Sequence, residues 1–171
     1  SGVSGGGGIR SMQSWTNNGT WYRPANCTTI IVTVVGAGGG GSGFCESGGA
    51  GGMSERVIDV TNVSSVNVTC GNPGGGTNYS GCGGNGNTSS FGSYCNASGG
   101  IGANCSQNRC GGYGGNGSGG TLNIYGGGGN GHGSYWSFGN HTGGTSFIGG
   151  SQPCSHNQNN YAYNHQSHAA W

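Results

Sequence analysis

The chain has 171 residues, of which 46 are glycine, and glycine, serine, asparagine and threonine together fill 100 positions. Leu, Ile, Val and Phe number only 21, with Leu122 the single leucine. This composition argues against a large helical core, because helices need leucine, alanine, glutamate and lysine. Lysine is absent and only four arginines are present, so the clustered basic charge that binds nucleic acid is missing. No run approaches the roughly 20 apolar residues of a membrane span.

The first part of the chain, residues 1–15, is expected to be a flexible N-terminal segment. Its tip is almost entirely glycine and serine, whereas 9–15 contains Ile9, Met12 and Trp15. An apolar set of this kind favours either an edge strand within the same subunit or docking on a neighbouring one. Addition of such a strand to another subunit uses main-chain hydrogen bonds and needs no charge.

Residues 16–70 are predicted to be a small antiparallel β unit. The strongest strand is 28–35, which is β-branched throughout. Residues 53–60 and 63–70 alternate apolar with polar side chains, which predicts two more strands. In the last of these, three residues face one way: Val66, Val68 and Cys70. The Thr61-Asn62 pair between them is typical of a hairpin turn.

Residues 71–151 are dominated by glycine. Between 111 and 129, glycine recurs at nearly every third position, and a three-residue repeat is that of the polyproline II helix. This helix has no internal hydrogen bonds, so it must pack beside others, which glycine permits. The alternative is a set of tight turns that join short strands, such as 121–125 and 135–138.

The expected fold class is therefore all-β. It combines a small antiparallel sheet or sandwich with a glycine-rich, loop or polyproline-II-like second layer, held by disulfide bonds. Residues 16–171 are predicted to form one domain, in which 152–171 is a tail rich in Asn, Gln, His and Tyr.

The cysteines are even in number, spread along the chain and not arranged in the pairs of a zinc ribbon. We therefore expect disulfide bonds formed in an oxidising compartment. Disulfides also offset the entropy of ordering many glycines. The spacing does not select the pairing. The cysteines expected to be bonded are Cys27, Cys45, Cys70, Cys82, Cys95, Cys105, Cys110 and Cys154.

The N-x-S/T acceptor of N-glycosylation occurs ten times, against roughly four expected by chance from this composition. This excess, together with the cysteines, points to N-glycosylation in a secretory pathway, although a chain rich in Asn, Ser and Thr also produces unused acceptors. The candidate glycosylation sites are Asn18, Asn26, Asn62, Asn67, Asn78, Asn87, Asn96, Asn104, Asn116 and Asn140. The chain begins at Ser1 without an apolar leader, as expected of a mature secreted form, and a truncated form looks the same.

Residues that carry catalysis are scarce. The three acids are Glu46, Glu55 and Asp59; with Arg56 between the last two, a surface ion pair is expected, and a glycosidase pair is the alternative. His156, His165 and His168 are candidate metal ligands, against a simple polar tail. A phosphate loop that ends in Gly-Lys-Ser/Thr is excluded, because the chain has no lysine. We expect no enzyme activity, cofactor or metal.

Trp21-Tyr-Arg-Pro24, followed by the strand and glycine run of 28–41, resembles the opening of the glycine-rich domain found at the ends of many phage tail fibres and in assorted secreted proteins. The resemblance continues in order through 49–60, 64–76, 88–93 and 98–102, and covers roughly 15–150. It implies a β-rich, glycine-packed module displayed on a fibre, often adhesive and without catalytic residues. Eight cysteines are unusual in the reducing bacterial cytoplasm where phage fibres assemble. The cysteines and sequons favour a secreted, eukaryotic glycoprotein.

Three functions are therefore considered. The first is an extracellular, N-glycosylated structural subunit of a fibre or coat, which has itself as partner in a homo-oligomer or helical filament. The second is an adhesin tip that binds a receptor or cell-surface glycans. The third is an ice-binding protein with a flat polyproline II face. The aromatic residues available for stacking on sugars are Tyr79, Tyr94, Tyr113, Tyr125, Tyr135 and Trp136.

Overall fold

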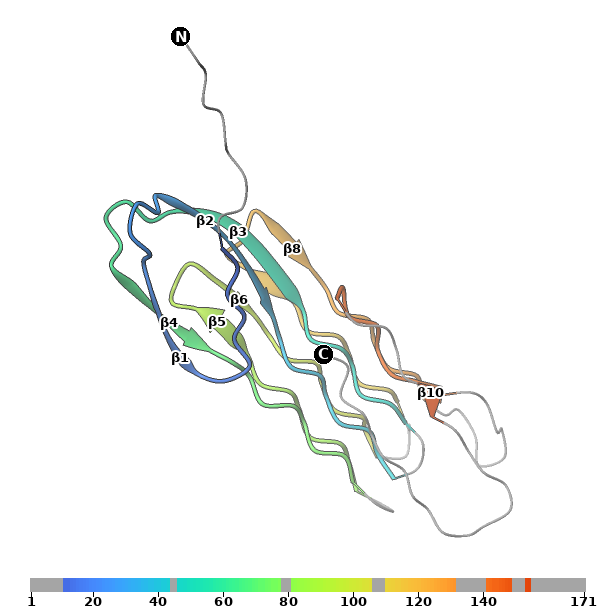
Figure 1. Ribbon diagram of the computed structural model, residues 1–171. Coiled ribbons are helices and arrows are strands. Elements are labelled where there is room, and N and C mark those ends of the chain that lie inside the picture. The colour runs from blue at the N-terminus through green and yellow to red at the C-terminus, as the bar shows by residue number, and fades with distance from the viewer. Residues whose placement is uncertain are drawn as a thin grey trace.

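The computed structural model describes residues 11–43, 46–77, 81–105, 110–131, 141–148 and 153–154, and every regular element in these ranges is a β-strand (Figure 1). The strands are β1 (Gly19–Tyr22), β2 (Thr29–Val35), β3 (Met53–Asp59), β4 (Ser65–Thr69), β5 (Ser89–Phe91), β6 (Cys95–Ala97), β7 (Gly117–Ser118), β8 (Leu122–Ile124), β9 (His141–Thr142) and β10 (Pro153–Cys154). The predicted all-β fold is confirmed.

Two antiparallel sheets form a sandwich. One has the strand order β1-β4-β5-β6-β7 and the other β2-β3-β8, while β9 and β10 pair separately. The apolar faces of β2 and β3 lie against the larger sheet and bury Val34 and Ile58. At the centre of the core, the rings of Trp21 and Phe91 pack edge to face with centroids 5.7 Å apart. Such aromatic pairs supply much of the buried area in a chain this poor in aliphatic residues.

The turn predicted at Thr61-Asn62 exists, but it is not a hairpin turn. Val63 N donates to Val60 O across it at 3.0 Å. The strands on either side belong to different sheets, because β3 pairs with β2 and β8, whereas β4 pairs with β1 and β5. The sandwich also takes β5 to β8 from residues beyond 70. The β unit is therefore not limited to 16–70.

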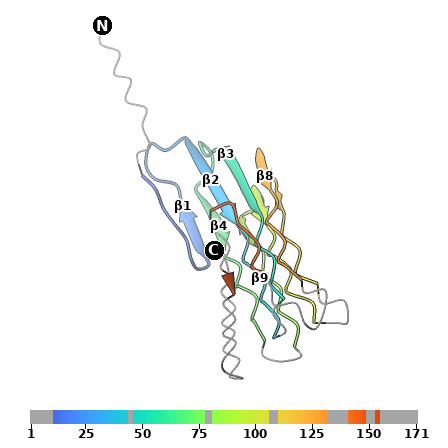
Figure 2. The same cartoon turned by 90° about the vertical axis from the view of Figure 1, so that its right-hand side faces the viewer.

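Glycine-rich segments continue from the strands and run side by side away from the sandwich (Figures 1 and 2). Seven of them are called rods here, in chain order: rod 1 (36–43), rod 2 (46–52), rod 3 (71–77), rod 4 (81–88), rod 5 (98–105), rod 6 (110–116) and rod 7 (125–131). Each strand from β2 to β8 leads into a rod or emerges from one, so the sandwich and the rods are one continuous structure.

Main-chain hydrogen bonds between the rods follow a period of three. Rod 1 donates to rod 2 from Gly36, Gly39 and Ser42, with N···O distances of 2.8 to 2.9 Å. In rod 2, Gly49 bonds with rods 1 and 5, whereas the next residue, Ala50, bonds with rods 6 and 7. A chain that turns its polar groups to the same neighbour at every third residue has the repeat of a polyproline II helix. The predicted polyproline-II-like layer is thus a bundle of antiparallel and parallel rods.

Most glycines in the rods serve close packing rather than unusual backbone angles. A Cβ atom added to Gly51 would lie 1.8 Å from the carbonyl oxygen of Gly36, and one added to Gly49 would lie 2.0 Å from that of Tyr113. Positive φ is found among the described glycines only at Gly92 (52°) and Gly119 (80°), in the tight turns after β5 and β7. Of the glycines that the structure describes, these two need the left-handed freedom of the residue.

Candidate functional surfaces

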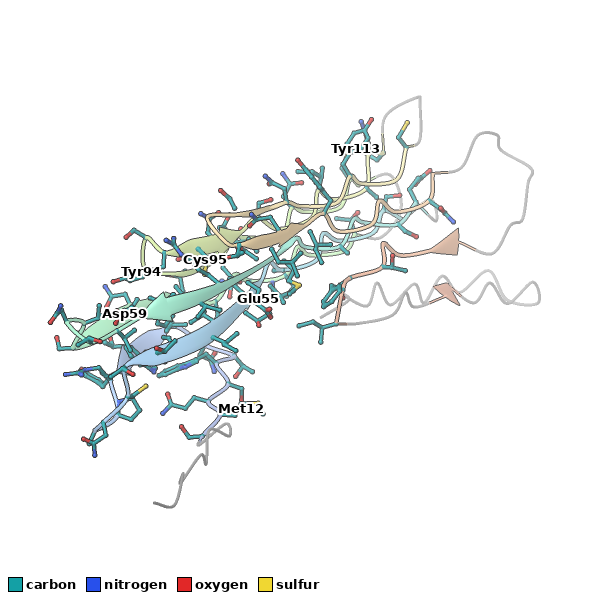
Figure 3. The ribbon with its side chains drawn as sticks, turned by 90° about the horizontal axis from the view of Figure 1, so that it is seen from above. Met12, Glu55, Asp59, Tyr94, Cys95 and Tyr113 are labelled. Carbon is teal, nitrogen blue, oxygen red and sulfur yellow. A yellow bond between two sulfur atoms is a disulfide. The ribbon has the colours of Figure 1, made fainter. Side chains whose placement is uncertain are left out.

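Residues 15–18 fold back on their own chain. Trp15 packs over Gly19, where an added Cβ would lie 2.4 Å from the ring. Asn18 Oδ1 accepts a hydrogen bond of 2.8 Å from Cys70 N, which holds this segment at the end of β4. Residues 11–14 are exposed, with the Met12 side chain 90 % accessible (Figure 3). Ile9, the other apolar residue of the predicted N-terminal strand, lies outside the described residues.

The outer edge of β2 is the longest unpaired strand edge of the described sandwich. β2 pairs with β3 from Thr29↔Asp59 to Val35↔Met53. The bonds Val60 N to Thr28 O and Gly36 N to Gly52 O fix the alternation, so the even-numbered residues of β2 face β3. Ile31, Thr33 and Val35 therefore direct their main-chain groups outward, where no described residue is hydrogen-bonded to them. On the opposite side of the sandwich, β7 and β8 follow one another through a tight turn.

The side chains on the outer face of this sheet include an exposed apolar pair. Ile31 is 65 % accessible and its cross-strand partner Val57 is 59 % accessible. Beside them, Thr33 Oγ1 donates to Glu55 Oε2 at 2.7 Å. Thus the free edge of β2 is bordered by a partly apolar surface.

Glu55, Arg56 and Asp59 do not form the ion pair that the sequence predicts. Asp59 Oδ1 instead accepts from the hydroxyl and the N–H of Thr61, at 2.6 and 2.8 Å. These hydrogen bonds hold the pKa of Asp59 below its usual value, and the bond from the Thr61 hydroxyl contributes more than the bond from the Thr61 N–H. Glu55 and Asp59 are four residues apart on β3, so their Cα atoms are separated by about 13 Å.

Arg56 lies between the two sheets. Its Nη1 donates to the carbonyl oxygen of Tyr94 at 2.8 Å and to that of Gly119 at 3.2 Å. Both acceptors belong to turns, one before β6 and the other after β7. Arg56 therefore connects β3 to the larger sheet and has a structural role.

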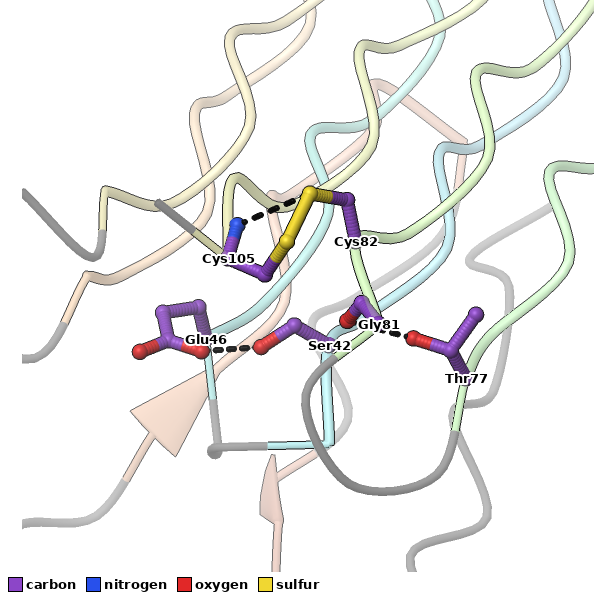
Figure 4. The surroundings of a disulfide bond; sticks show 6 residues. All are labelled: Ser42, Glu46, Thr77, Gly81, Cys82 and Cys105. Atoms are coloured by element: carbon purple, nitrogen blue, oxygen red, sulfur yellow. Dashed lines mark hydrogen bonds between the residues drawn. A yellow bond between two sulfur atoms is a disulfide. The ribbon is translucent and has the colours of Figure 1, made fainter. Parts of the chain in front are cut away.

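Cys82 and Cys105 form a disulfide between rods 4 and 5 (Figure 4). Near it, Glu46 is buried at the end of rod 2, where its Oε2 accepts from the Ser42 hydroxyl. Its Oε1 has no hydrogen-bond partner among the described residues. Groups of three or more metal-ligating side chains are absent from the part of the chain that the structure describes.

Three of the other cysteines are thiols, which differs from the prediction that all eight form disulfides. They are Cys27, Cys70 and Cys95. Cys95 is 1 % accessible in the core, and burial raises its pKa, while the charge of Arg56 lowers it by a smaller amount. Burial also raises the pKa of Cys70, whose thiol lies 3.3 Å from Asn17 O. Cys95 belongs to the cluster of buried apolar residues that forms the core, a position where cysteine packs well without a bond. Cys45 and the side chain of Cys154 lie outside the described residues.

The candidate glycosylation sites are all exposed where the structure describes them. The eight asparagines concerned are Asn18, Asn26, Asn62, Asn67, Asn87, Asn96, Asn104 and Asn116. On β4 the predicted alternation holds, since Val66 is buried and Asn67 faces solvent. Asn78 and Asn140 lie outside the described residues. A glycan is bulky and polar and must stay at the surface of the folded protein, so these exposed positions are compatible with modification.

The aromatic candidates divide into two groups. Tyr94 packs on Phe91, with ring centroids 6.1 Å apart, and belongs to the core. Tyr113 and Tyr125, on rods 6 and 7, are 76 % and 78 % accessible (Figure 3 for Tyr113). Tyr79, Tyr135 and Trp136 lie outside the described residues. The candidate metal ligands His156, His165 and His168 do too.

The outward-facing side of rod 6 could not be recognised from residue types alone. In rod 6 the non-glycine residues Cys110, Tyr113 and Asn116 are exposed, whereas Gly112 and Gly115 between them are buried. Their spacing in the sequence does indicate a common direction, because these three side chains are three residues apart, as are the glycines around them. They mark the outer side of the rod.

The described residues contain no helix that could cross a membrane. Among curated proteins, no match to this chain is found. A family model described as a glycine-rich domain matches residues 13–170, nearly the whole chain. The matched range includes the glycine-rich rods as well as the strands. The chain therefore belongs to the glycine-rich domain family.

Proposed function

We propose that this protein is a secreted, N-glycosylated structural subunit of an extracellular fibre or coat, which assembles through β-strand contacts. The observation that carries this proposal is the outer edge of β2, which pairs with no strand among the described residues. The strand has seven residues, without charge or proline. Natural sheets protect such edges with lysine, proline, bulges or a covering element, and an unprotected edge is a template for another strand.

An incoming strand gains more than main-chain hydrogen bonds. Ile31 and Val57 extend an apolar surface next to the edge. The formal net charge of +1 also gives little repulsion between copies. We expect residues 9–16 of a neighbouring copy to supply the strand, because Met12 in this segment is left 90 % accessible. Strand addition of this kind suits a chain with few charged residues.

An extracellular location is supported by the exposure of the eight described sequon asparagines and by the Cys82–Cys105 disulfide. Glycans on these sites would supply the hydration that charged side chains do not. The test is intact mass spectrometry of the native protein before and after an amidase that removes N-glycans. We expect the mass to fall by several glycans, with Asp at the occupied positions. An unchanged mass would reject a secreted glycoprotein.

A receptor- or glycan-binding adhesin tip is the second candidate, favoured by the exposure of Tyr113 and Tyr125. The family match identifies a glycine-rich domain and does not distinguish between a structural subunit and an adhesin. Electron microscopy separates the two functions. Ordered filaments of this chain alone support the structural subunit, whereas isolated copies that bind an immobilised glycan array support the adhesin.

A further inference from the structure

Two exposed tyrosines lie next to a candidate glycosylation site on the outer side of rods 6 and 7. Tyr113 and Tyr125 are among the most accessible large side chains described, and Asn116 is exposed as well. Covering these two rings is favourable, because it removes apolar area from water.

The period of the rods places the three side chains together. Tyr113 precedes Asn116 by three residues, one turn of a polyproline II helix, so the two lie on the same line about 9 Å apart. The bond from Gly126 N to Gly115 O, 2.9 Å, pairs rod 7 with rod 6. This register sets Tyr125 beside Asn116 on the neighbouring rod. The asparagine is thus flanked by one ring along its own rod and by another on the neighbouring rod.

Packing fixes the direction of these positions. A Cβ on Gly114 would meet rod 7 at 1.8 Å, and one on Gly115 would meet rod 5 at 2.1 Å. The third position of the repeat, occupied by Tyr113 and Asn116, is the one that faces out. In rod 7, an added Cβ on Gly128, one turn from Tyr125, would meet only Gly112 O, at 3.5 Å. That line of rod 7 faces out too.

Ser98 on rod 5 orients the asparagine. Its hydroxyl donates to Asn116 Oδ1 at 2.8 Å and accepts from Asn116 N at 2.8 Å. Because Oδ1 is held toward Ser98, the other amide atom, Nδ2, is directed away from rod 5. Nδ2 is the atom that carries an N-glycan.

We propose that the glycan on Asn116 packs its first sugars against Tyr113 and Tyr125, a contact that rests on the glycosylation proposed above. In that modification Nδ2 loses a proton and bonds to the anomeric carbon of a lipid-linked oligosaccharide, and lipid diphosphate leaves. The C–H face of a sugar ring is apolar and stacks on an aromatic face. Covalent attachment keeps the sugar near both rings at a high effective concentration, which a free sugar or a second copy of the chain does not have.

The test uses full-length protein from a secretory host and nitration of tyrosine, read by peptide mass spectrometry. Sequon Asn96 is the matched control, since it is exposed on β6 and its cross-strand neighbours are Ser90 and Ser118. We expect N116Q to raise nitration of Tyr113 and Tyr125 several-fold, and N96Q to leave it unchanged. In addition, the double variant Y113A/Y125A should lower the Tm by roughly 2–4 °C, and this loss should disappear in the N116Q background.

Equal nitration of the two tyrosines in N116Q and wild type would overturn the proposal. So would a Tm loss that is the same with and without the sequon. An unmodified Asn116 in a protein glycosylated elsewhere would also overturn it, while leaving the proposed function intact. Absence of glycans at every site would reject both.

Discussion

The α-carbon of Gly51 lies against the carbonyl group of Gly36, so close that an added Cβ would be 1.8 Å from the oxygen and 2.2 Å from the carbon. The two residues belong to rods 2 and 1, which are joined by main-chain hydrogen bonds on either side of this contact. The rods therefore touch backbone to backbone, and the space that a side chain normally fills does not exist. High glycine content is a packing requirement of this bundle.

Gly51→Ala is expected to destabilise the protein severely, by about 3 kcal/mol or more, because main-chain atoms cannot give way as a flexible side chain does. Gly75→Ala is the matched control, since an added Cβ there meets nothing within 4 Å. It should be neutral or slightly stabilising through the unfolded state. Urea denaturation of both variants measures the difference. Equal stability of the two would contradict backbone packing as the reason for the glycines.

The thiols should differ in reactivity. Alkylation of the native protein at pH 8 is expected to label Cys27 readily and Cys95 only after denaturant is added. The Cys95 thiol is buried, and burial raises its pKa, so both access and the thiolate fraction are low. Cys82 and Cys105 should react only after reduction. A non-reducing peptide map that places Cys27, Cys70 or Cys95 in a disulfide would contradict the structure.

Arg56→Met is expected to cost about 2 kcal/mol of folding free energy, because it removes a charged donor from the carbonyls of Tyr94 and Gly119. Arg56→Lys should recover only part of this loss, since one ammonium group cannot reproduce the geometry of a planar guanidinium. Thermal unfolding followed by circular dichroism makes the comparison. Wild-type stability in Arg56→Met would show that the bridge between the sheets is unimportant.

Asp59 should make the stability of the protein depend weakly on pH in the acid range. The hydrogen bonds from the Thr61 hydroxyl and N–H hold the pKa of the Asp59 carboxyl in the folded state below its usual value, so the ionised form stabilises the fold. That stabilisation is present above the unfolded pKa and is lost as the pH falls through the folded pKa. In Thr61→Ala, which loses the hydroxyl but keeps the N–H, the pKa of Asp59 should rise. A carboxyl titration by NMR tests this, and an unchanged pKa would exclude Thr61 as the cause.

The sequence predicted the strands better than their partners. β2 was evident because 28–35 is a β-branched run, and β4 because Val66 and Asn67 alternate between core and solvent. The strands that pair with β3 could not be predicted in the same way. The turn residues at Thr61-Asn62 predict that the chain reverses direction, but they do not specify which sheet the next strand joins.

The rods could be predicted only in part, for a related reason. In 111–129 the non-glycine residues reveal the period of three. In 36–43 almost every residue is glycine, so no side chain shows which direction each position faces. The phase of rod 1 is set by contacts with rods 2 and 4, which are remote in sequence. For the same reason, the proximity of Tyr125 to Asn116 depends on the register between two rods and could not be read from either alone.

The role of the β2 edge in assembly is most simply tested by placing a charged side chain beside it. Ile31→Lys places an ammonium group next to the edge at a position that is 65 % accessible, so folding should be retained. Lysine at an edge is a common natural block to strand addition. Val57→Lys is the matched control, because Val57 is the cross-strand partner of Ile31 and is similarly exposed, but lies on the central strand β3.

Sedimentation velocity of full-length, glycosylated protein over a range of concentrations is the most direct measurement of self-assembly. The account predicts large assemblies for the wild type and for Val57→Lys, and monomers for Ile31→Lys. A wild-type protein that remains monomeric at high concentration, or an Ile31→Lys variant that assembles as well as the wild type, would contradict assembly through the β2 edge.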